Sequence, residues 1–179
     1  ARARIILGRT KGVVEDIRRL WAVGQSQPKA CDVPFTWMIK THGVSEGLAW
    51  QRIFLAIEAN DRALVRYLGR FVPAAERRWL DDWRSLSRGG HARIERMVRW
   101  QDNPATRRIA ALSLQRLARN DAARAARVCD GLAAHFAWQE DQKQALWREI
   151  ALWSAVSLDA DTAARMARVD ASQRDSQLL

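Results

Sequence analysis

The sequence predicts an all-α protein, an irregular superhelix (α-solenoid) of about ten short helices in antiparallel pairs. Apolar residues recur at helical spacing along the whole chain, and no stretch alternates with the period of two that a half-buried strand requires. Turn-forming residues interrupt the pattern at intervals of roughly 10 to 20 residues. Short turns between antiparallel helices favour stacked pairs, and stacked pairs favour an open superhelix over a closed bundle.

Five apolar stripes define helices in chain order. Their members lie three, four, seven or eight residues after the first member, which brings the side chains to one face of a helix. The stripes are Val13-Ile17-Leu20-Trp21, Phe35-Met38-Ile39, Trp50-Ile53-Phe54-Ile57, Leu64-Leu68-Phe71 and Leu146-Ile150-Trp153.

The first connection follows Leu20 and Trp21. Gly24 is expected to close the first stripe's helix in the left-handed conformation. Ser26 is a candidate cap for the next helix, and the backbone angle of Pro28 already suits a first helical turn. We expect the rest of the chain to repeat this helix–turn–helix pattern.

Later helix starts carry similar signals. Asn103 before Pro104 places a capping side chain ahead of a proline at the first helical position. Asn60-Asp61 and Asn120-Asp121 resemble caps of the same kind. The segments 58–63 and 118–123 also echo one another at an offset of 60 residues, which is two helix-pair repeats of about 30 residues.

Positive charge is concentrated in the middle of the chain, whose net charge is +10. Residues 84–127 hold 11 basic and 3 acidic residues, a net of +8, and residues 128–179 hold 5 basic and 8 acidic residues, a net of −3. The basic stretch suggests an anionic partner such as nucleic acid, an acidic cell-wall polymer or a membrane surface. The alternative is that arginine and alanine fill solvated helix faces.

Nine tryptophans accompany a single tyrosine. An exposed tryptophan can stack on a sugar ring or a base, but core packing is the better expectation for any one of them. Those expected to pack between helix pairs are Trp21, Trp50, Trp79, Trp83 and Trp153, whereas Trp37, Trp100, Trp138 and Trp147 are less cleanly placed.

The residues form no catalytic pattern. A glycoside-cleaving site needs a carboxyl group kept protonated in an apolar cleft, and the seven glutamates lie near turns, charged neighbours or helical pairing partners. Asp81 and Asp82 are adjacent on a helix and point in different directions. The scattered histidines and the 98-residue separation of Cys31 and Cys129 predict no metal site. We expect no catalytic residue and no cofactor, and no apolar run is long enough for a membrane span.

Three segments resemble the soluble lytic murein transglycosylases of Gram-negative bacteria. They fall in the family's order, and the similarity extends over nearly the whole chain. They are Gln25-Ser26-Gln27-Pro28-Lys29-Ala30-Cys31-Asp32 just after Leu20-Trp21, the run from Arg52 to Asp61, and the segment from Glu140-Asp141-Gln142 through Leu146, Ile150 and Ala151 to Trp153.

In that family a superhelix of paired helices forms a U, which a linker domain closes into a ring, and a lysozyme-like catalytic domain rests on it. The resemblance implies that residues 1–179 are a single internal segment of the U, cut from a longer chain without that catalytic domain. The family's catalytic glutamate lies in a Glu-Ser motif, and no glutamate here precedes serine. The family's Gly-Leu-Met-Gln motif is also missing. The resemblance implies that the parent protein cleaves the link between N-acetylmuramic acid and N-acetylglucosamine and leaves a 1,6-anhydro end. Because both motifs are missing, no catalytic residue of the family is assigned to this chain.

The resemblance also implies a periplasmic protein in which Cys31 forms a disulfide with a cysteine upstream of Ala1. A bond between Cys31 and Cys129 is the alternative. Cys129 is better suited to the role of a small buried thiol.

The leading hypothesis is a non-catalytic scaffold that positions peptidoglycan for the missing linker and catalytic domains. Its arginine-rich stretch would line the inner face of the curve and hold stem-peptide carboxylates, and nucleic acid would not be a partner. The candidate contacts are Arg93, Arg96, Arg99, Trp100, Arg107, Arg108, Arg116 and Arg119. The alternatives are a basic helical-repeat module that binds nucleic acid in a strongly salt-dependent way, and a protein-interaction solenoid.

Overall fold

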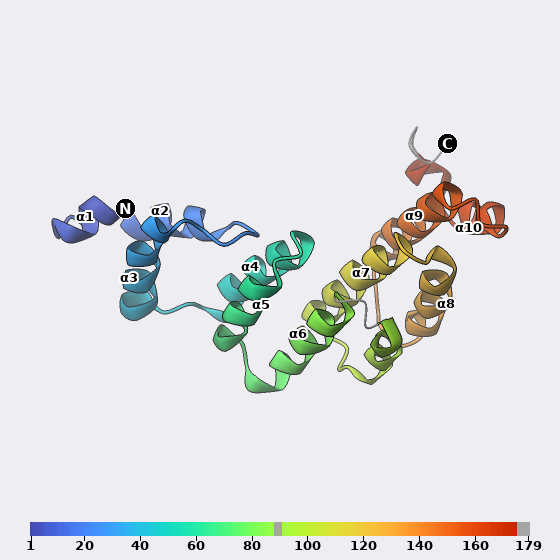
Figure 1. Ribbon diagram of the computed structural model, residues 1–179, viewed down its shortest axis with the longest axis horizontal. Helices are drawn as coiled ribbons and strands as arrows, with labels where there is room; N and C mark the ends of the chain where they lie inside the picture. Colours follow the sequence, from blue (N-terminus) through green and yellow to red (C-terminus); the bar gives the residue numbers. More distant parts are fainter. Residues whose placement is uncertain (88–90, 175–179) are drawn as a thin grey trace. The chain divides into compact units, whose positions relative to one another are not determined.

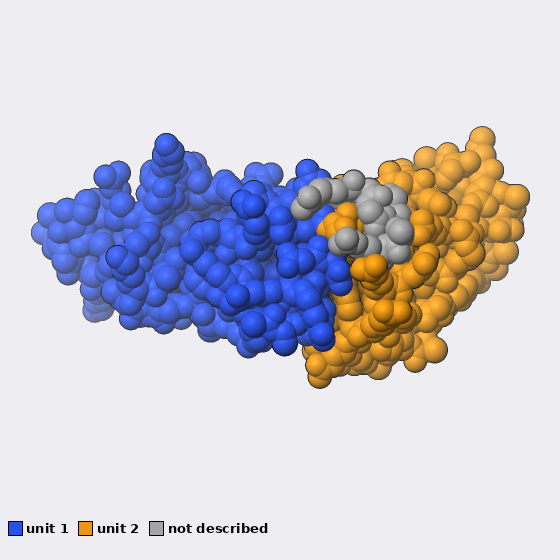
Figure 2. Space-filling model, turned by 60° about the horizontal axis from the view of Figure 1, so that its bottom comes forward, with its two compact units in different colours: residues 1–84 blue, residues 85–179 orange. Residues whose placement is uncertain are grey.

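The computed structural model describes residues 1–87 and 91–174, without the side chains of residues 91–93. The regular elements of these residues are all helices and include no strand, so the predicted all-α class is confirmed (Figure 1). The chain divides into two compact units, Ala1–Arg84 and Ser85–Leu179, coloured separately in Figure 2.

Unit 1 begins with short helices and continues into longer ones. A turn of three residues joins α4 to α5, so these two helices form an antiparallel pair. The elements are α1 (Arg2–Ile6), α2 (Val13–Trp21), the 3-10 turn η1 (Lys29–Cys31), α3 (Asp32–His42), α4 (Glu46–Glu58), α5 (Arg62–Leu68), η2 (Gly69–Phe71) and α6 (Ala74–Leu86), the last of which ends just past the unit boundary.

Unit 2 contains the two longest helices of the described chain. Another three-residue turn makes α7 and α8 an antiparallel pair. The elements are the 3-10 helix η3 (His91–Arg99), α7 (Pro104–Ala118), α8 (Ala122–Ala133), α9 (Glu140–Val156), α10 (Thr162–Ala167) and η4 (Ala171–Gln173).

Tryptophans supply much of the core. Of the five tryptophans expected in the core, four are buried and Trp153 is partly exposed. Of the four that the sequence placed less cleanly, Trp100, Trp138 and Trp147 are also buried. In unit 1 the fully buried ring of Trp21 packs edge-on against Phe35 and Phe71. The buried guanidinium of Arg52 lies 4.4 Å from the centre of the Trp21 ring, which provides a favourable face for its charge.

The connection after α2 differs from the prediction. Gly24 does not have a left-handed backbone, because α2 already ends at Trp21. A Cβ atom at Gly24 would lie 2.2 Å from the carbonyl oxygen of Leu55, so a close approach to α4 explains this glycine. Ser26 caps no helix and instead donates to Asp61, and Pro28 precedes η1 as its N-cap residue.

The capping residues predicted for the later helices were more reliable than the predictions for the connection after α2. Asn103 accepts hydrogen bonds from the backbone N–H groups of Ala105 and Thr106, and Pro104 begins α7 as predicted. At the two echoing turns the aspartates are the caps: Asp61 accepts from Leu64 N and Asp121 from Arg124 N. The echo therefore marks equivalent turns between α4 and α5 and between α7 and α8.

Candidate functional site

In the 3-10 helix η3, the side chains of arginines three residues apart lie on the same side of the helix. A 3-10 helix has three residues per turn, so side chains three positions apart lie in one row. Ile94, Met97 and Trp100 form such a row and are buried, with at most 5% of each exposed. Arg96 and Arg99 form a neighbouring row and are exposed. The core row fixes the direction of the arginine row.

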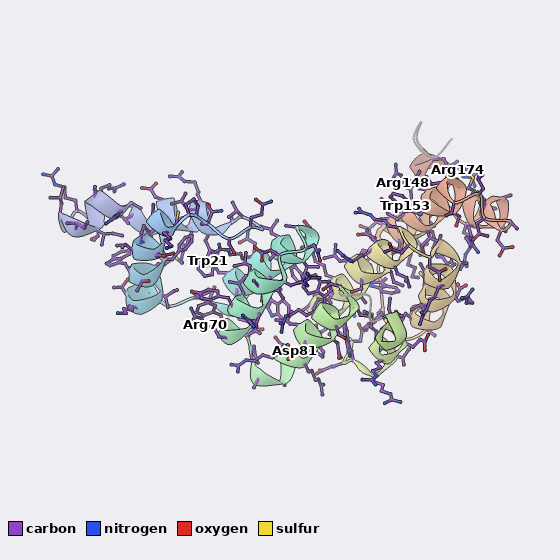
Figure 3. The ribbon with its side chains drawn as sticks, in the orientation of Figure 1. Trp21, Arg70, Asp81, Arg148, Trp153 and Arg174 are labelled. Atoms are coloured by element: carbon purple, nitrogen blue, oxygen red, sulfur yellow. The ribbon has the colours of Figure 1, made fainter. Side chains whose placement is uncertain are left out.

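The helix α7 carries a second exposed pair. Arg108 and its C-cap residue Arg119 are eleven residues apart, which places them on nearly the same face, about 16 Å apart along the axis. The guanidinium carbon of Arg119 lies 5.9 Å from the centre of the Trp153 ring on α9. Trp153, labelled in Figure 3, is partly exposed, and its Nε1 donates to Glu149.

Two predicted contact residues have internal partners. Arg107 donates from Nε to Asp102 Oδ1 (2.5 Å) and from Nη2 to Asp102 Oδ2 (2.9 Å). These hydrogen bonds lower the pKa of Asp102 and raise the pKa of Arg107, although burial opposes both shifts. Arg116 donates to the carbonyl oxygen of Ser87 at 3.4 Å. Both arginines therefore hold segments of unit 2 together.

Trp100 is not available for stacking on a ligand. It is only 5% exposed, and its carbonyl oxygen is 2.7 Å from Nε2 of His135. The structure thus places Trp100 in the core, and Trp153 is the partly exposed tryptophan that contacts one of the candidate arginines. Arg93 lies in η3, but its side chain is outside the described residues.

A pocket of about 250 Å³ between η3 and α8 was not identified from the sequence. Arg124 donates to Glu95 Oε1 across it at 3.0 Å, which links the two helices. Its lining residues are Glu95, Val98, Arg124, Arg127, Val128, Gly131 and Leu132. Glu95 and Val98 stand three apart in the remaining row of η3, so a search for period three would have grouped them.

In the described part of the chain, the cysteines and other potential metal ligands form no cluster. Cys31 and Cys129 are both free thiols, so the alternative bond between them does not form. Burial, with help from Asp130, raises the pKa of Cys129 to about 12. Within residues 1–87 and 91–174, no three His, Cys, Asp or Glu side chains gather as a metal ion would require. No helix there is long and apolar enough to cross a membrane.

The chain is similar to curated lytic transglycosylases along almost all of its length. The soluble lytic murein transglycosylases of Escherichia coli K12 and Salmonella typhimurium LT2 are each 30% identical to it over 169 residues. The aligned region covers 93% of this chain and 26% of those proteins. The predicted resemblance is confirmed. This chain spans about a quarter of the length of these soluble lytic murein transglycosylases.

Solved structures of soluble lytic transglycosylases share the fold. The 70 kDa enzyme of Escherichia coli matches with a TM-score of 0.79 at 25% identity, covering 96% of this chain and 29% of that one. An inactive mutant of the enzyme Slt from Pseudomonas aeruginosa matches with a TM-score of 0.76 at 28% identity, covering 99% and 29%. No protein-family model matches the chain.

Proposed function

We propose that this chain is a non-catalytic scaffold segment of a periplasmic lytic transglycosylase from a Gram-negative bacterium. Its role is to position peptidoglycan strands, and its partners are the linker and catalytic domains of the parent protein. The parent cleaves the link between N-acetylmuramic acid and N-acetylglucosamine to a 1,6-anhydro product. One observation carries this proposal: nearly the whole chain is similar to a segment that makes up about a quarter of the length of soluble lytic murein transglycosylases. This chain contains no Glu-Ser motif.

The environment of Glu76 supports a non-catalytic role. Burial raises the pKa of Glu76, the hydrogen bond from Trp50 opposes that rise, and nearby Glu46 adds to it. A raised pKa is typical of a general acid, but here the Glu76 carboxylate accepts the indole N–H of Trp50 at 3.1 Å. This contact ties α6 to α4, which is a structural role.

The proposed contacts with peptidoglycan are the exposed arginines of η3 and α7. A guanidinium group holds a carboxylate through two parallel hydrogen bonds, and peptidoglycan stem peptides carry carboxylates. The ring of Trp153 beside Arg119 offers an apolar surface to a sugar. The proposed set is Arg96, Arg99, Arg108 and Arg119, with Trp153 in place of Trp100.

Co-sedimentation with purified sacculi across a salt gradient tests this proposal. The variant R96Q/R99Q/R108Q/R119Q should lose most of the binding, because it removes four exposed charges. The matched control R2Q/R9Q/K29Q/R78Q removes the same amount of charge from exposed positions in unit 1 and should still bind sacculi. Circular dichroism of each variant checks that its helices remain folded.

Equal loss of binding in both variants would show that binding depends on net charge alone, which would contradict the proposed contacts. Retention of binding by the first variant would also contradict them. Binding of duplex DNA in preference to sacculi at equal salt would favour a nucleic-acid partner instead.

A further inference from the structure

A separate group of arginines surrounds a pocket in unit 1. The pocket has a volume of about 260 Å³ and lies between the segment α5–η2 and the helix α6. Figure 3 labels one residue from each side, Arg70 and Asp81. The lining consists of Val65, Arg66, Gly69, Arg70, Arg77, Leu80, Asp81 and Arg84.

Helical spacing accounts for this grouping. Arg77 and Arg84 are seven residues apart on α6, so two helical turns return them to the same face. Arg66 on α5 and Arg70 on η2 line the pocket from the other side. Guanidinium groups therefore approach the pocket from two elements.

Two of these arginines are oriented by contacts within unit 1. Arg77 donates from Nε to the carbonyl oxygen of Gly69 at 3.0 Å, a bond that uses one of its five N–H donors. The guanidinium carbon of Arg70 lies 3.8 Å from the centre of the Tyr67 ring. These contacts hold both side chains in place before any ligand arrives, which lowers the entropic cost of binding.

The charge of the lining is unbalanced. Four arginines line the pocket with a single acidic residue, Asp81, which pairs with Arg84 Nη1 at 3.0 Å. The Asp81 side chain is 70% exposed, so solvent screens its charge and the pair contributes little. The lining has a net charge of +3, which favours an anion.

We propose that this pocket binds a small oxyanion, through a carboxylate or phosphate group. Guanidinium forks match both groups. Val65 and Leu80 offer apolar contact for a short carbon chain. The volume corresponds to roughly nine water molecules and suits a small molecule or a single ligand side group. The site lies in unit 1, whereas the proposed peptidoglycan contacts lie in unit 2, so this inference does not depend on the proposed function.

Isothermal titration calorimetry with glutarate, inorganic phosphate and chloride at constant ionic strength and pH 7 tests the site. The wild-type chain should bind glutarate, phosphate or both, and chloride should give no comparable signal. The variant R66Q/R70Q should weaken binding by about tenfold or more, because it removes two of the four guanidinium groups that can form charge-assisted hydrogen bonds to the anion. Arg77 and Arg84 are left intact because they already make internal contacts.

The charge-matched control R9Q/R78Q changes exposed arginines that do not line the pocket and should bind within about twofold of the wild type. A preference for glutarate assigns the pocket to carboxylates, a preference for phosphate assigns it to phosphates, and either result supports the site. Absence of binding to the wild type, or equal weakening in both variants, would overturn the proposal.

Discussion

The carboxylate of Asp61 accepts both the backbone N–H and the hydroxyl group of Ser26, each at 3.1 Å, across 35 residues of sequence. Its other oxygen accepts Leu64 N at 2.9 Å and caps α5. The Asp61 side chain thus caps the start of α5 and also holds the connection that follows α2 against it. Burial raises the pKa of Asp61, but the hydrogen bonds from Leu64 and Ser26 outweigh burial, so its net pKa is lowered.

The variant D61A should lower the free energy of unfolding by about 2–3 kcal/mol, because it removes a helix cap and two further hydrogen bonds. Urea titration followed by circular dichroism measures this loss. The control D121A removes an equivalent cap on α8, for which a cost of about 1 kcal/mol is expected. Equal losses in the two variants would contradict the importance of the bonds to Ser26.

Two glycines in unit 1 should respond in opposite directions to alanine. G24A should destabilise unit 1 by several kcal/mol, about 3 or more, because the new Cβ would clash with the backbone of α4. G47A should stabilise it by up to about 1 kcal/mol, because Gly47 lies in the first turn of α4 and the new Cβ would meet no other part of the chain within 4 Å. Thermal unfolding of both variants provides the check. If G24A unfolds at the same temperature as the wild type, the close approach to Leu55 does not require a glycine at this position.

The pair formed by Asp102 and Arg107 predicts a dependence of stability on acid pH. The hydrogen bond from Arg107 lowers the folded-state pKa of Asp102. The stabilisation is therefore complete above the unfolded-state value of about 3.9 and is lost as the pH falls through the lower folded-state value. D102N should be less stable than the wild type at pH 7, and this difference should shrink toward pH 2. A difference that stays constant over that range would contradict the assignment.

The two thiols should differ in reactivity. Cys129 is buried with its pKa raised to about 12, so only about one thiol in 10⁴ is ionised at pH 8. Iodoacetamide should therefore label the less buried Cys31 and spare Cys129 until urea unfolds the chain. Mass spectrometry of the labelled peptides distinguishes the two sites. Labelling of Cys129 at the rate of Cys31 in the native state would contradict the structure.

Local signals in the sequence predicted the helices well. The capping side chain of Asn103 and the following Pro104 act within one turn of helix, so their meaning does not depend on the tertiary fold. Gly24 and Ser26 could not be interpreted in this way, because their partners Leu55 and Asp61 lie more than 30 residues away.

The proposed arginine contacts were selected from charge density alone. Charge density drew attention to residues 84–127, but it could not separate the partly buried Arg107, which pairs with Asp102, from the more exposed Arg108 beside it. Trp100 was kept as a candidate stacking residue because a helical period of 3.6 did not place it on an apolar stripe. The row formed with Ile94 and Met97 has a period of three and marks a buried face.

The proposed function requires that this chain binds peptidoglycan without cleaving it. The most direct measurement incubates the chain with purified sacculi and records both the sedimented protein and the soluble 1,6-anhydro muropeptides that are released. We expect binding that exceeds that of an equally charged helical protein, with no release above a protein-free control. Release of anhydro products by the chain alone, or binding no greater than that of the control protein, would contradict this account.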